Sequence, residues 1–259
     1  MKFYFDTEYV NGNYYMCDIF DMSLLSDQTE NTCHIYIKQD IPLSDAVVKI
    51  TKITNQVLNE NGVDGFSDAV AAMTRFIKDE IKSLLKDNST ATIDDVIVTF
   101  IAHGGFDTDF PYFINNCRKN KVVLDDVYKK VLNQDSMLSF KKHNSTPGLS
   151  ALARMFNLEQ GYQRHSSYGD VWILKKLCDR HTPYISMLTK NYKQICTDIR
   201  EKMPVDFEEI RFLKREIHQL NPIQYMEDML RLRTKSKNSS LRNNNLSKIC
   251  NYFINRKHF

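Results

Sequence analysis

Apolar residues near the start of the chain recur in short runs that are typical of β-strands. An aromatic run covers residues 3–5 and ends in two acids that are separated by one residue. A second apolar run covers residues 14–20, directly after the turn-forming triplet Asn-Gly-Asn, and an alternating His-Ile-Tyr-Ile run lies within residues 33–38. These three segments predict strands that are joined by hairpin connections.

A helical period follows from residue 50 onward. Residues 50–59 and 66–85 repeat apolar side chains every three or four positions, which predicts two amphipathic helices. In the longer helix the apolar stripe consists of Phe66, Val70, Met73, Ile77, Ile81 and Leu84. The apolar run at residues 96–102 is continuous, which indicates a central strand that is buried on both faces.

Strands and helices then alternate up to about residue 178. The pattern predicts a short strand at residues 122–124 and helices at residues 110–117, 126–132, 149–156 and 169–178. Hairpin-linked strands followed by alternating strands and helices indicate an α/β fold, with a mixed β-sheet flanked by helices.

The C-terminal part of the sequence has a different pattern, in which helices are predicted without strands. Amphipathic helices are predicted at residues 185–200, 207–220 and 223–232. Residues 234–247 are rich in Lys, Asn and Ser, as linkers are, and a last short helix is expected at residues 246–259. We therefore predict an α/β domain over residues 1–180 and a helical, basic C-terminal extension over residues 181–259.

Composition bounds the class of protein. Of the 259 residues, 42% are apolar and 26% are charged, which is typical of a soluble globular protein, and no apolar run is long enough to cross a membrane. Six cysteines are scattered without a C-x-x-C pair, which disfavours a zinc site and a disulfide framework. Because a strand is predicted from residue 3, no room is left for a signal peptide, and we expect an intracellular protein of the cytoplasm or nucleus. Frequent Asn, Lys and Ile are typical of an AT-rich genome such as a viral one.

Charge is distributed unevenly along the chain. Residues 180–259 carry 16 Lys/Arg and 8 Asp/Glu, whereas residues 1–179 carry 19 Lys/Arg and 24 Asp/Glu. From Arg231 to the end there is no acid at all. An acidic body with a basic tail predicts a negatively charged partner for the tail, with nucleic acid first and an anionic membrane second.

Candidate chemistry begins where the first predicted strand ends. Side chains alternate along a strand, so Asp6 and Glu8 point to the same side, about 7 Å apart along the backbone. Their hard carboxylate oxygens suit Mg²⁺ or Mn²⁺ better than Zn²⁺. An isolated Asp-x-Glu is more often a strand that ends in solvated acids, so this pair needs partners elsewhere in the chain.

Two later segments supply candidate partners. Asp107 follows the central strand, after Gly104 and Gly105, at the sheet edge where α/β proteins place their ligands. The alternative is that Asp107 caps the next helix. His165 and Asp170 lie in the lead-in and the first turn of the following predicted helix, a spacing that carries little information alone.

Taken in this order, the segments resemble the three motifs of the DEDDh 3′–5′ exonucleases, which belong to the ribonuclease H-like superfamily. The motifs are Phe-Asp6-Thr-Glu8, Ala-His-Gly-Gly-Phe-Asp107 and His165-x₄-Asp170. The resemblance covers residues 1 to about 180, and Ile50-Thr-Lys-Ile-Thr54, Val123-Leu-Asp125 and the helix at 149–156 agree with it. The sequence departs from the family pattern at three places. Gly104 stands where Asn is usual, and the gap to the following acid is usually longer. Lys52 stands where Gly is usual, and Ser167 stands where Ala is usual.

The resemblance implies a site that holds two Mg²⁺ or Mn²⁺ ions. Asp6 would bridge both ions, and Glu8 and Asp170 would complete the site of the ion that binds the attacking water. Asp107 would act on the second ion. His165 would be the catalytic general base, because imidazole accepts a proton near neutrality. Substrate contacts are expected from Thr7, Tyr9, His103 and Phe106, for which plain packing is the alternative.

The implied activity is metal-dependent hydrolysis of phosphodiester bonds from the 3′ ends of single-stranded DNA or RNA. The motif context resembles proofreading and DNA-repair exonucleases most, which favours DNA, and the alternative is an exoribonuclease that trims RNA 3′ ends. Outside enzymes, the alternatives are a non-catalytic nucleic-acid-binding protein and an interaction protein that docks on a polymerase or a membrane. The basic tail is expected to contact substrate phosphates or a protein partner.

Overall fold

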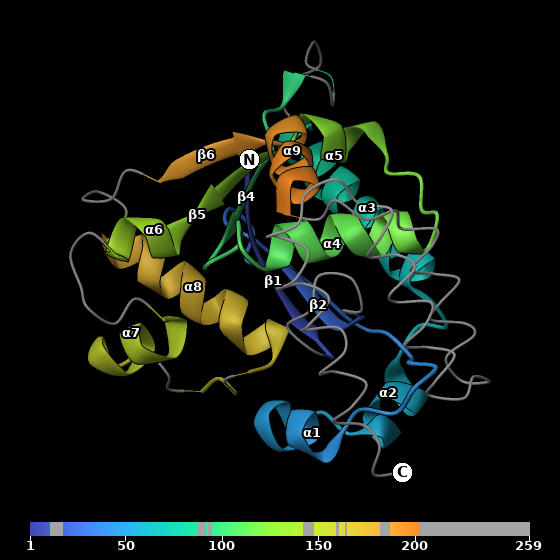
Figure 1. Cartoon of the computed structure of the whole chain (residues 1–259). Helices are drawn as coiled ribbons and strands as arrows, with labels where there is room; N and C mark the ends of the chain where they lie inside the picture. Colours follow the sequence, from blue (N-terminus) through green and yellow to red (C-terminus); the bar gives the residue numbers. More distant parts are fainter. Residues whose placement is uncertain are drawn as a thin grey trace.

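A six-stranded mixed β-sheet lies at the centre of the molecule (Figure 1). The computed structural model describes residues 1–10, 18–86, 92, 95–141, 148–158, 161–163, 165–181 and 187–202. The strands are β1 (Lys2–Tyr9), β2 (Ile19–Ser26), β3 (Thr32–Tyr36), β4 (Thr99–Ala102), β5 (Leu132–Asp135) and β6 (Leu188–Asn191). The helices are α1 (Asp45–Thr51), α2 (Asn55–Asn61), α3 (Phe66–Leu85), α4 (Asp109–Lys119), α5 (Asp126–Lys130), α6 (Ser136–Lys141), α7 (Leu149–Met155), α8 (Ser167–His181) and α9 (Tyr192–Lys202).

The strand order β3-β2-β1-β4-β5-β6 places β1 in the middle of the sheet. Strands β1, β4 and β5 are parallel to one another, whereas β2 pairs antiparallel with β1 and β3, and β6 pairs antiparallel with β5. The carboxyl ends of the three parallel strands therefore meet at one edge, where α/β proteins place their ligands. The predicted mixed sheet with flanking helices is confirmed.

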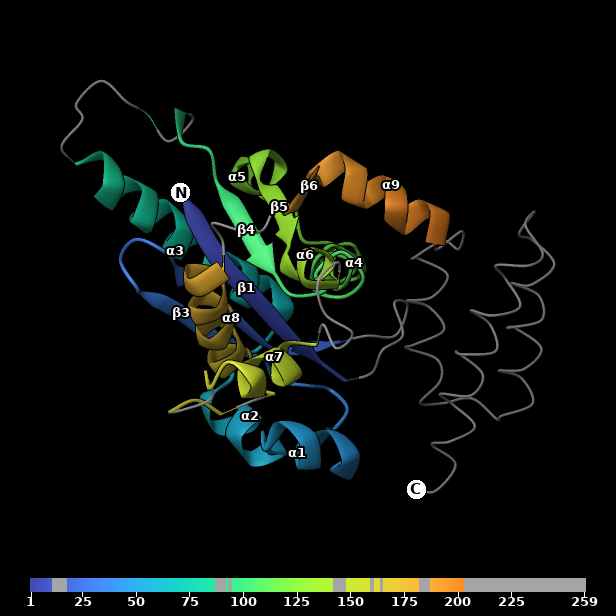
Figure 2. The same ribbon diagram turned by 90° about the vertical axis from the view of Figure 1, so that its left-hand side faces the viewer.

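Strand β1 is buried on both faces over its first half. Phe3 and Phe5 point into the main core, which α3, α4, α5 and α9 cover. Tyr4 points to the opposite face, where it packs against α8, the helix that crosses in front of β1 in Figure 2. Aromatic residues at successive positions are expected for a strand that is covered on both sides.

Helix α3 matches the apolar stripe that the sequence shows. Phe66, Val70, Met73, Ile77 and Ile81 are buried in the main core, as the helical period predicts. Leu84, at the end of the same stripe, is 44% exposed.

The second strand differs from the sequence prediction. It runs over Ile19–Ser26 rather than residues 14–20, and residues 11–17 lie outside the described part of the chain. Asp21, Ser23 and Ser26 gave this segment the polarity of a loop, yet all three are fully buried in the strand. The prediction was wrong because Asp21 and Ser23 find a partner in the distant Ser167, which only the folded chain provides.

The helix predicted at residues 50–59 is two helices, α1 and α2. Lys52 adopts the left-handed conformation (φ 61°) at the end of α1 and separates the two. Such a residue cannot continue a right-handed helix, and Lys in this conformation is unusual.

The helix predicted at residues 126–132 is confirmed as α5 (Asp126–Lys130), whereas the strand predicted at residues 122–124 was wrong. Residues 122–124 form no strand, and Val123 is 91% exposed. Asp125 caps α5 by accepting the Val127 N–H at 3.1 Å, so it does not end a strand as the resemblance implied. The strand that ends in an acid before a helix is β5, which the polar residues Asn133 and Asp135 concealed.

The predicted helix at residues 185–200 contains a strand and a helix in the described residues. Strand β6 pairs with β5, and α9 buries Ile195, Cys196 and Ile199 in the main core. The described residues after 180 therefore continue the α/β unit. Of the predicted extension over residues 181–259, the part over residues 203–259, with its predicted helices and basic tail, lies outside the described residues and stays a prediction.

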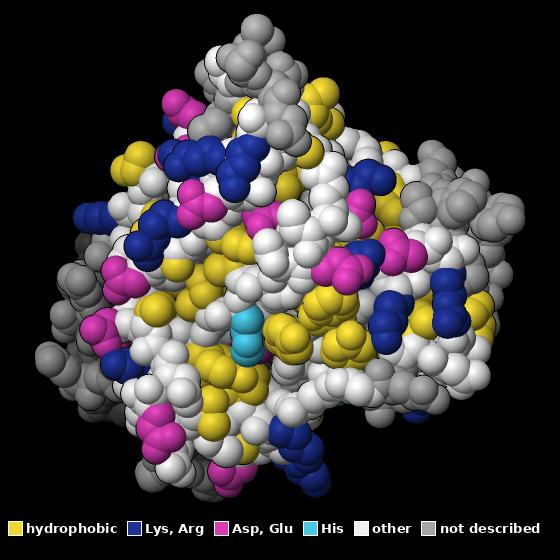
Figure 3. All heavy atoms as spheres, turned by 180° about the vertical axis from the view of Figure 1, so that it is seen from behind, with side chains coloured by type: hydrophobic (Ala, Val, Ile, Leu, Met, Phe, Trp, Pro, Cys, Tyr) yellow, Lys and Arg dark blue, Asp and Glu magenta, His cyan; other side chains and the backbone are white. Residues whose placement is uncertain are grey.

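Acidic and basic side chains intermingle on the face shown in Figure 3, around apolar side chains near its centre. No helix among the described residues has the length and the hydropathy that a membrane span needs.

Candidate active site

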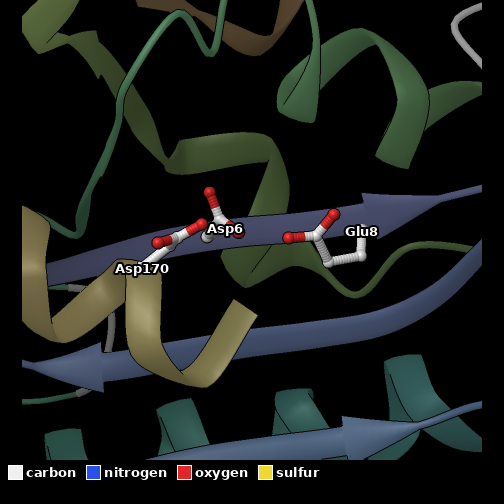
Figure 4. Close-up of side chains that lie close together, drawn as sticks. All are labelled: Asp6, Glu8 and Asp170. Carbon is white, nitrogen blue, oxygen red and sulfur yellow. The ribbon is translucent and has the colours of Figure 1, made fainter. Parts of the chain in front are cut away.

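Three carboxylates meet at the carboxyl end of β1. Asp6 and Glu8 project from the same face of the strand, and Asp170 reaches them from the first turn of α8 (Figure 4). One carboxylate oxygen of each lies within 4.8 Å of the other two. The structure thus brings together three of the four acids that the sequence singled out.

The surroundings of these acids disfavour their negative charge. Desolvation, followed by the charges of Asp109, Asp170, Glu8 and Asp21, raises the pKa of Asp6 well above its ordinary value. Desolvation and the charges of Asp170, Asp21 and Asp109 raise the pKa of Glu8 to about 9. Carboxyl groups that repel one another in this way are stabilised by a bound cation.

The first turn of α8 is built so that Asp170 can face β1. Ser166 caps the helix, since its Oγ accepts the Gly169 N–H at 3.3 Å and its carbonyl accepts the Asp170 N–H at 2.9 Å. A Cβ on Gly169 would lie 1.8 Å from the carbonyl oxygen of Gln163, so only glycine allows this close approach of the lead-in chain.

His165 lies directly before this cap. It is exposed and adopts a left-handed backbone conformation (φ 57°), and its N–H donates to Asp170 Oδ2 at 3.2 Å. Non-glycine residues in this conformation are uncommon and cluster at functional sites. The histidine that the sequence predicted as general base is therefore held beside the carboxylate cluster.

Asp107 is not placed with these carboxylates. Its side chain is exposed in the turn before α4, and it is not one of the three acids whose oxygens lie within 4.8 Å of one another. The acid that faces the cluster from this segment is Asp109, which is 3% exposed and exerts the largest charge effect on Asp6. The role given to Asp107 stays a prediction, and the structure adds Asp109, two residues later, as a second candidate.

Asp109 is fixed by bonds to β1. Its Oδ1 accepts both the backbone N–H of Thr7 at 2.9 Å and the Thr7 Oγ at 2.8 Å, and its Oδ2 accepts Thr108 Oγ at 3.0 Å. Desolvation raises the pKa of Asp109 to about 6, and the hydrogen bonds from Thr7 and Thr108 limit this rise.

A sequence signal for Asp109 does exist. Phe110 and Phe113 both pack on Phe5, with ring centroids 6.0 Å and 5.8 Å away. Because the two phenylalanines are three residues apart on one helix face, the residue before Phe110 lies next to β1. The start of that apolar stripe therefore offered Asp109 as a second candidate beside Asp107.

Asp135 was missed by the sequence analysis. At the end of β5 its buried carboxylate accepts N–H groups from Gly104 at 3.0 Å, Phe106 at 3.1 Å and Met137 at 2.9 Å. These bonds hold the loop between β4 and α4, and so the segment that carries Asp109, in a fixed shape.

The expected substrate contacts have structural roles. Thr7 is buried and holds Asp109, and Phe106 is buried in the main core against Phe110. His103 Nδ1 is hydrogen-bonded with Ser136 Oγ at 2.8 Å. Tyr9 is partly buried, with its ring 4.4 Å from that of Tyr112. Their roles as substrate contacts stay predictions.

The donor set fits a hard divalent cation. Asp6, Glu8 and Asp170 offer carboxylate oxygens only, at mutual distances that one small ion can span. Mg²⁺ and Mn²⁺ prefer such ligands, whereas Zn²⁺ favours nitrogen and sulfur.

Comparisons with known proteins identify the fold. No family model and no curated protein matches the chain. Among solved structures, it is similar to the nuclease domain of 3′hExo, a DEDDh family member bound to rAMP, with 14% identity and a TM-score of 0.53 over 73% of this chain and 96% of that one. It is also similar to a full-length 3′-exonuclease, with 17% identity and a TM-score of 0.54 over 74% of this chain and 67% of that one. A third is exonuclease I, with 12% identity and a TM-score of 0.54 over 83% of this chain and 43% of that one. The chain thus has the ribonuclease H-like fold of these exonucleases, as its motifs predicted.

Proposed function

We propose that the chain is a metal-dependent 3′–5′ exonuclease that hydrolyses phosphodiester bonds at nucleic-acid 3′ ends. The observation that supports this most is the meeting of Asp6, Glu8 and Asp170 within 4.8 Å. The cluster lies at the carboxyl edge of a sheet whose fold is shared with DEDDh exonucleases.

Asp6, Glu8 and Asp170 would hold two Mg²⁺ or Mn²⁺ ions. When bound, such ions lower the pKa of a water nucleophile and neutralise charge that develops on the phosphoryl group. The chain's own contribution is a fixed carboxylate set at the end of a rigid, doubly covered strand, which spares the site the reorganisation that flexible ligands would need.

His165 would accept the proton of the attacking water. Its exposure gives water and substrate access to the ring, and its backbone bond to Asp170 keeps it beside the carboxylates. A general base of this kind contributes on the order of 10²–10⁴-fold to the rate.

Asp109 would take the place that the resemblance gave to Asp107. Its charge acts on Asp6 more strongly than that of any other acid. Its two oxygens are bonded to Thr7 and Thr108, so it would act beside the Asp6–Glu8–Asp170 group as a positioned charge.

DNA is the favoured substrate by the motif context, and RNA is the alternative. The similar nuclease domain of 3′hExo was solved with rAMP, a ribonucleotide, which supports testing both nucleic acids side by side.

The test is degradation of 5′-labelled single-stranded DNA, duplex DNA and single-stranded RNA of one sequence, with Mg²⁺, Mn²⁺ or EDTA. We expect a ladder that shortens from the 3′ end only with metal, no ladder for Asp6→Asn, and a loss of about 10²–10⁴-fold for His165→Ala with intact metal binding. An intact substrate under all conditions, with folded protein, would refute the proposed function. Shortening of RNA alone would select the exoribonuclease.

A further inference from the structure

Asp21 of β2 is a fully buried carboxylate outside the group that would hold the metal. In the sheet, β1 and β2 pair Glu8 with Asp21 and Asp6 with Ser23. Directly paired residues of neighbouring strands point to the same face. Asp21 and Ser23 therefore lie one strand away from Asp6 and Glu8, on the face that α8 covers.

The hydrogen bonds of Asp21 reach the first residue of α8. The Ser167 N–H donates to Asp21 Oδ2 at 3.0 Å, and Ser167 Oγ donates to Oδ1 at 2.6 Å. Because Ser167 Oγ gives its hydrogen to Asp21, Ser23 is the donor in the 2.8 Å contact between the two serine hydroxyls. His34 of β3 donates from Nε2 to Asp21 Oδ1 at 2.8 Å.

These bonds explain how a carboxylate can be buried here. A charge that is removed from water needs charge-assisted hydrogen bonds, and a backbone N–H at a helix N-terminus is a strong donor to an anion. Asp21 receives such an N–H together with a hydroxyl and an imidazole N–H. A carboxylate on one strand is thereby joined to a helix that begins 146 residues later.

The same bonds constrain Asp170. Ser167 is the first residue of α8, and Asp170 lies in that helix's first turn. A helical turn is stiff, so fixing Ser167 against β2 fixes where Asp170 stands relative to β1. The apolar packing of α8, through Val171, Leu174 and Cys178 on Tyr4 and Leu25, is non-directional and does not set the position along the helix axis.

We propose that Asp21 and Ser167 form a clasp that positions Asp170 against Asp6 and Glu8, so that both are positioning residues for divalent-cation binding. The proposal rests on the proposed function, because it assigns a role within that same site. It also gives a role to Ser167, which stands where the exonuclease family usually has Ala.

The competing explanation is that the clasp only satisfies buried polar groups and supports the fold. Two variants with matched controls separate the explanations. Asp21→Asn removes the charge and one acceptor, and Ser167→Ala removes the hydroxyl but keeps the backbone bond. Glu80→Gln is the control for a buried acid, since Glu80 is 6% exposed and holds Thr29 and Asn31 instead. Ser26→Ala is the control for a fully buried serine of β2.

The readouts are the Mn²⁺ dissociation constant by calorimetry, the Mn²⁺-induced rise in melting temperature, and the rate as a function of Mn²⁺ concentration. We expect Mn²⁺ binding to weaken about 10–100-fold in Asp21→Asn and by a smaller factor in Ser167→Ala, the range typical of residues that orient metal ligands. The rate at saturating Mn²⁺ should recover most of the wild-type value. The controls should lower the melting temperature without changing Mn²⁺ binding.

The double variant Asp21→Asn/Ser167→Ala sharpens the test. Because both residues act through one set of bonds, we expect Mn²⁺ binding only slightly weaker than in Asp21→Asn alone. If Asp21→Asn and Ser167→Ala both bind Mn²⁺ as tightly as the wild type, the clasp is overturned. It is also overturned if Glu80→Gln and Ser26→Ala weaken Mn²⁺ binding as much as these two variants do.

Failure of the clasp is distinguishable from failure of the proposed function. If wild-type protein binds no Mn²⁺ and degrades no nucleic acid, the proposed function is wrong. If wild-type protein binds Mn²⁺ and the Asp21 and Ser167 variants bind it equally well, only the clasp is wrong.

Discussion

Helices α4 and α8 each carry an acid in their first turn to the end of β1. The two acids, Asp109 and Asp170, are held there in different ways. At α4 the acid itself is bonded to the strand, because Asp109 accepts two bonds from Thr7. At α8 the bonds to the sheet are made by Ser167, and Asp170, one turn on, lies next to Asp6 and Glu8.

The difference indicates that Asp109 and Asp170 have different roles at the site. A carboxylate whose two oxygens both accept from hydroxyl or backbone donors, as in Asp109, acts mainly through its charge and its rigidity. Asp170 lies within 4.8 Å of Asp6 and Glu8 and can serve with them as a metal ligand. The bonds of Asp109 couple it to Thr7 of β1 and to Thr108 beside it, whereas the clasp at α8 spreads the constraint over β2 and β3.

The largest expected effect separates the two acids before α4. Asp109→Asn should lower the rate by on the order of 10²-fold, because it removes the charge that acts most strongly on Asp6. Asp107→Asn should leave the rate unchanged, because its side chain is exposed and lies outside the Asp6–Glu8–Asp170 group. Rates of the two purified variants at saturating Mg²⁺ check this, and a reversed order would return the role to Asp107.

A smaller effect is expected at Thr7. Thr7→Val keeps the shape of the side chain but removes the hydroxyl that donates to Asp109 Oδ1 at 2.8 Å. This bond lowers the pKa of Asp109, so its loss should raise that pKa and shift the pH dependence of Mn²⁺ binding toward higher pH. We expect about tenfold weaker binding near pH 6 and recovery by pH 8. Thr74→Val, at a partly buried threonine of α3, is the control, and equal pH profiles in Thr7→Val and wild type would contradict the role of this bond.

The smallest expected effect concerns stability without metal. The pKa of Glu8 is raised to about 9 and that of Asp109 to about 6, both above the values of about 4.3 and 3.9 in an unfolded chain. A carboxyl with a raised pKa in the folded state favours folding while it is protonated, and this contribution is lost as pH rises through the folded value. The melting temperature of metal-free protein should therefore fall from pH 5 to pH 9.

Two variants show which carboxyl causes the fall of the melting temperature in each part of that pH range. In melting curves recorded with EDTA, Glu8→Gln should reduce the fall of the melting temperature mainly between pH 6 and 9. Asp109→Asn should reduce it mainly below pH 6. Added Mg²⁺ should raise the melting temperature most at high pH, where the carboxylates are ionised. A melting temperature that rises with pH over this range in the metal-free protein would contradict the repulsion inferred at the site.

Local patterns predicted much of the fold and part of the site. The stripe of α3, the aromatic strand that ends in Asp6 and Glu8, and Asp170 in the first turn of a helix are all visible in the sequence. Each depends on spacing within one element, which side-chain periodicity encodes directly.

The failures share one physical cause. Strands β2 and β5 were misjudged because Asp21, Ser23, Asn133 and Asp135 are polar residues that are buried in the structure. A polar side chain predicts exposure unless a partner satisfies it, and here most of the partners come from distant segments. Asp109 was passed over for the same reason, since its bonds to Thr7 cross more than 100 residues.

The sequence by itself determined the order of the motifs, the chemistry of the carboxylates and the class of sheet, because these follow from residue types and local periods. Only the tertiary structure decided which acid before α4 faces β1 and which buried groups hold α8 in place. Those choices depend on hydrogen bonds between segments far apart in the chain, and such bonds form only when the sheet brings β1, β2 and the two helix ends together.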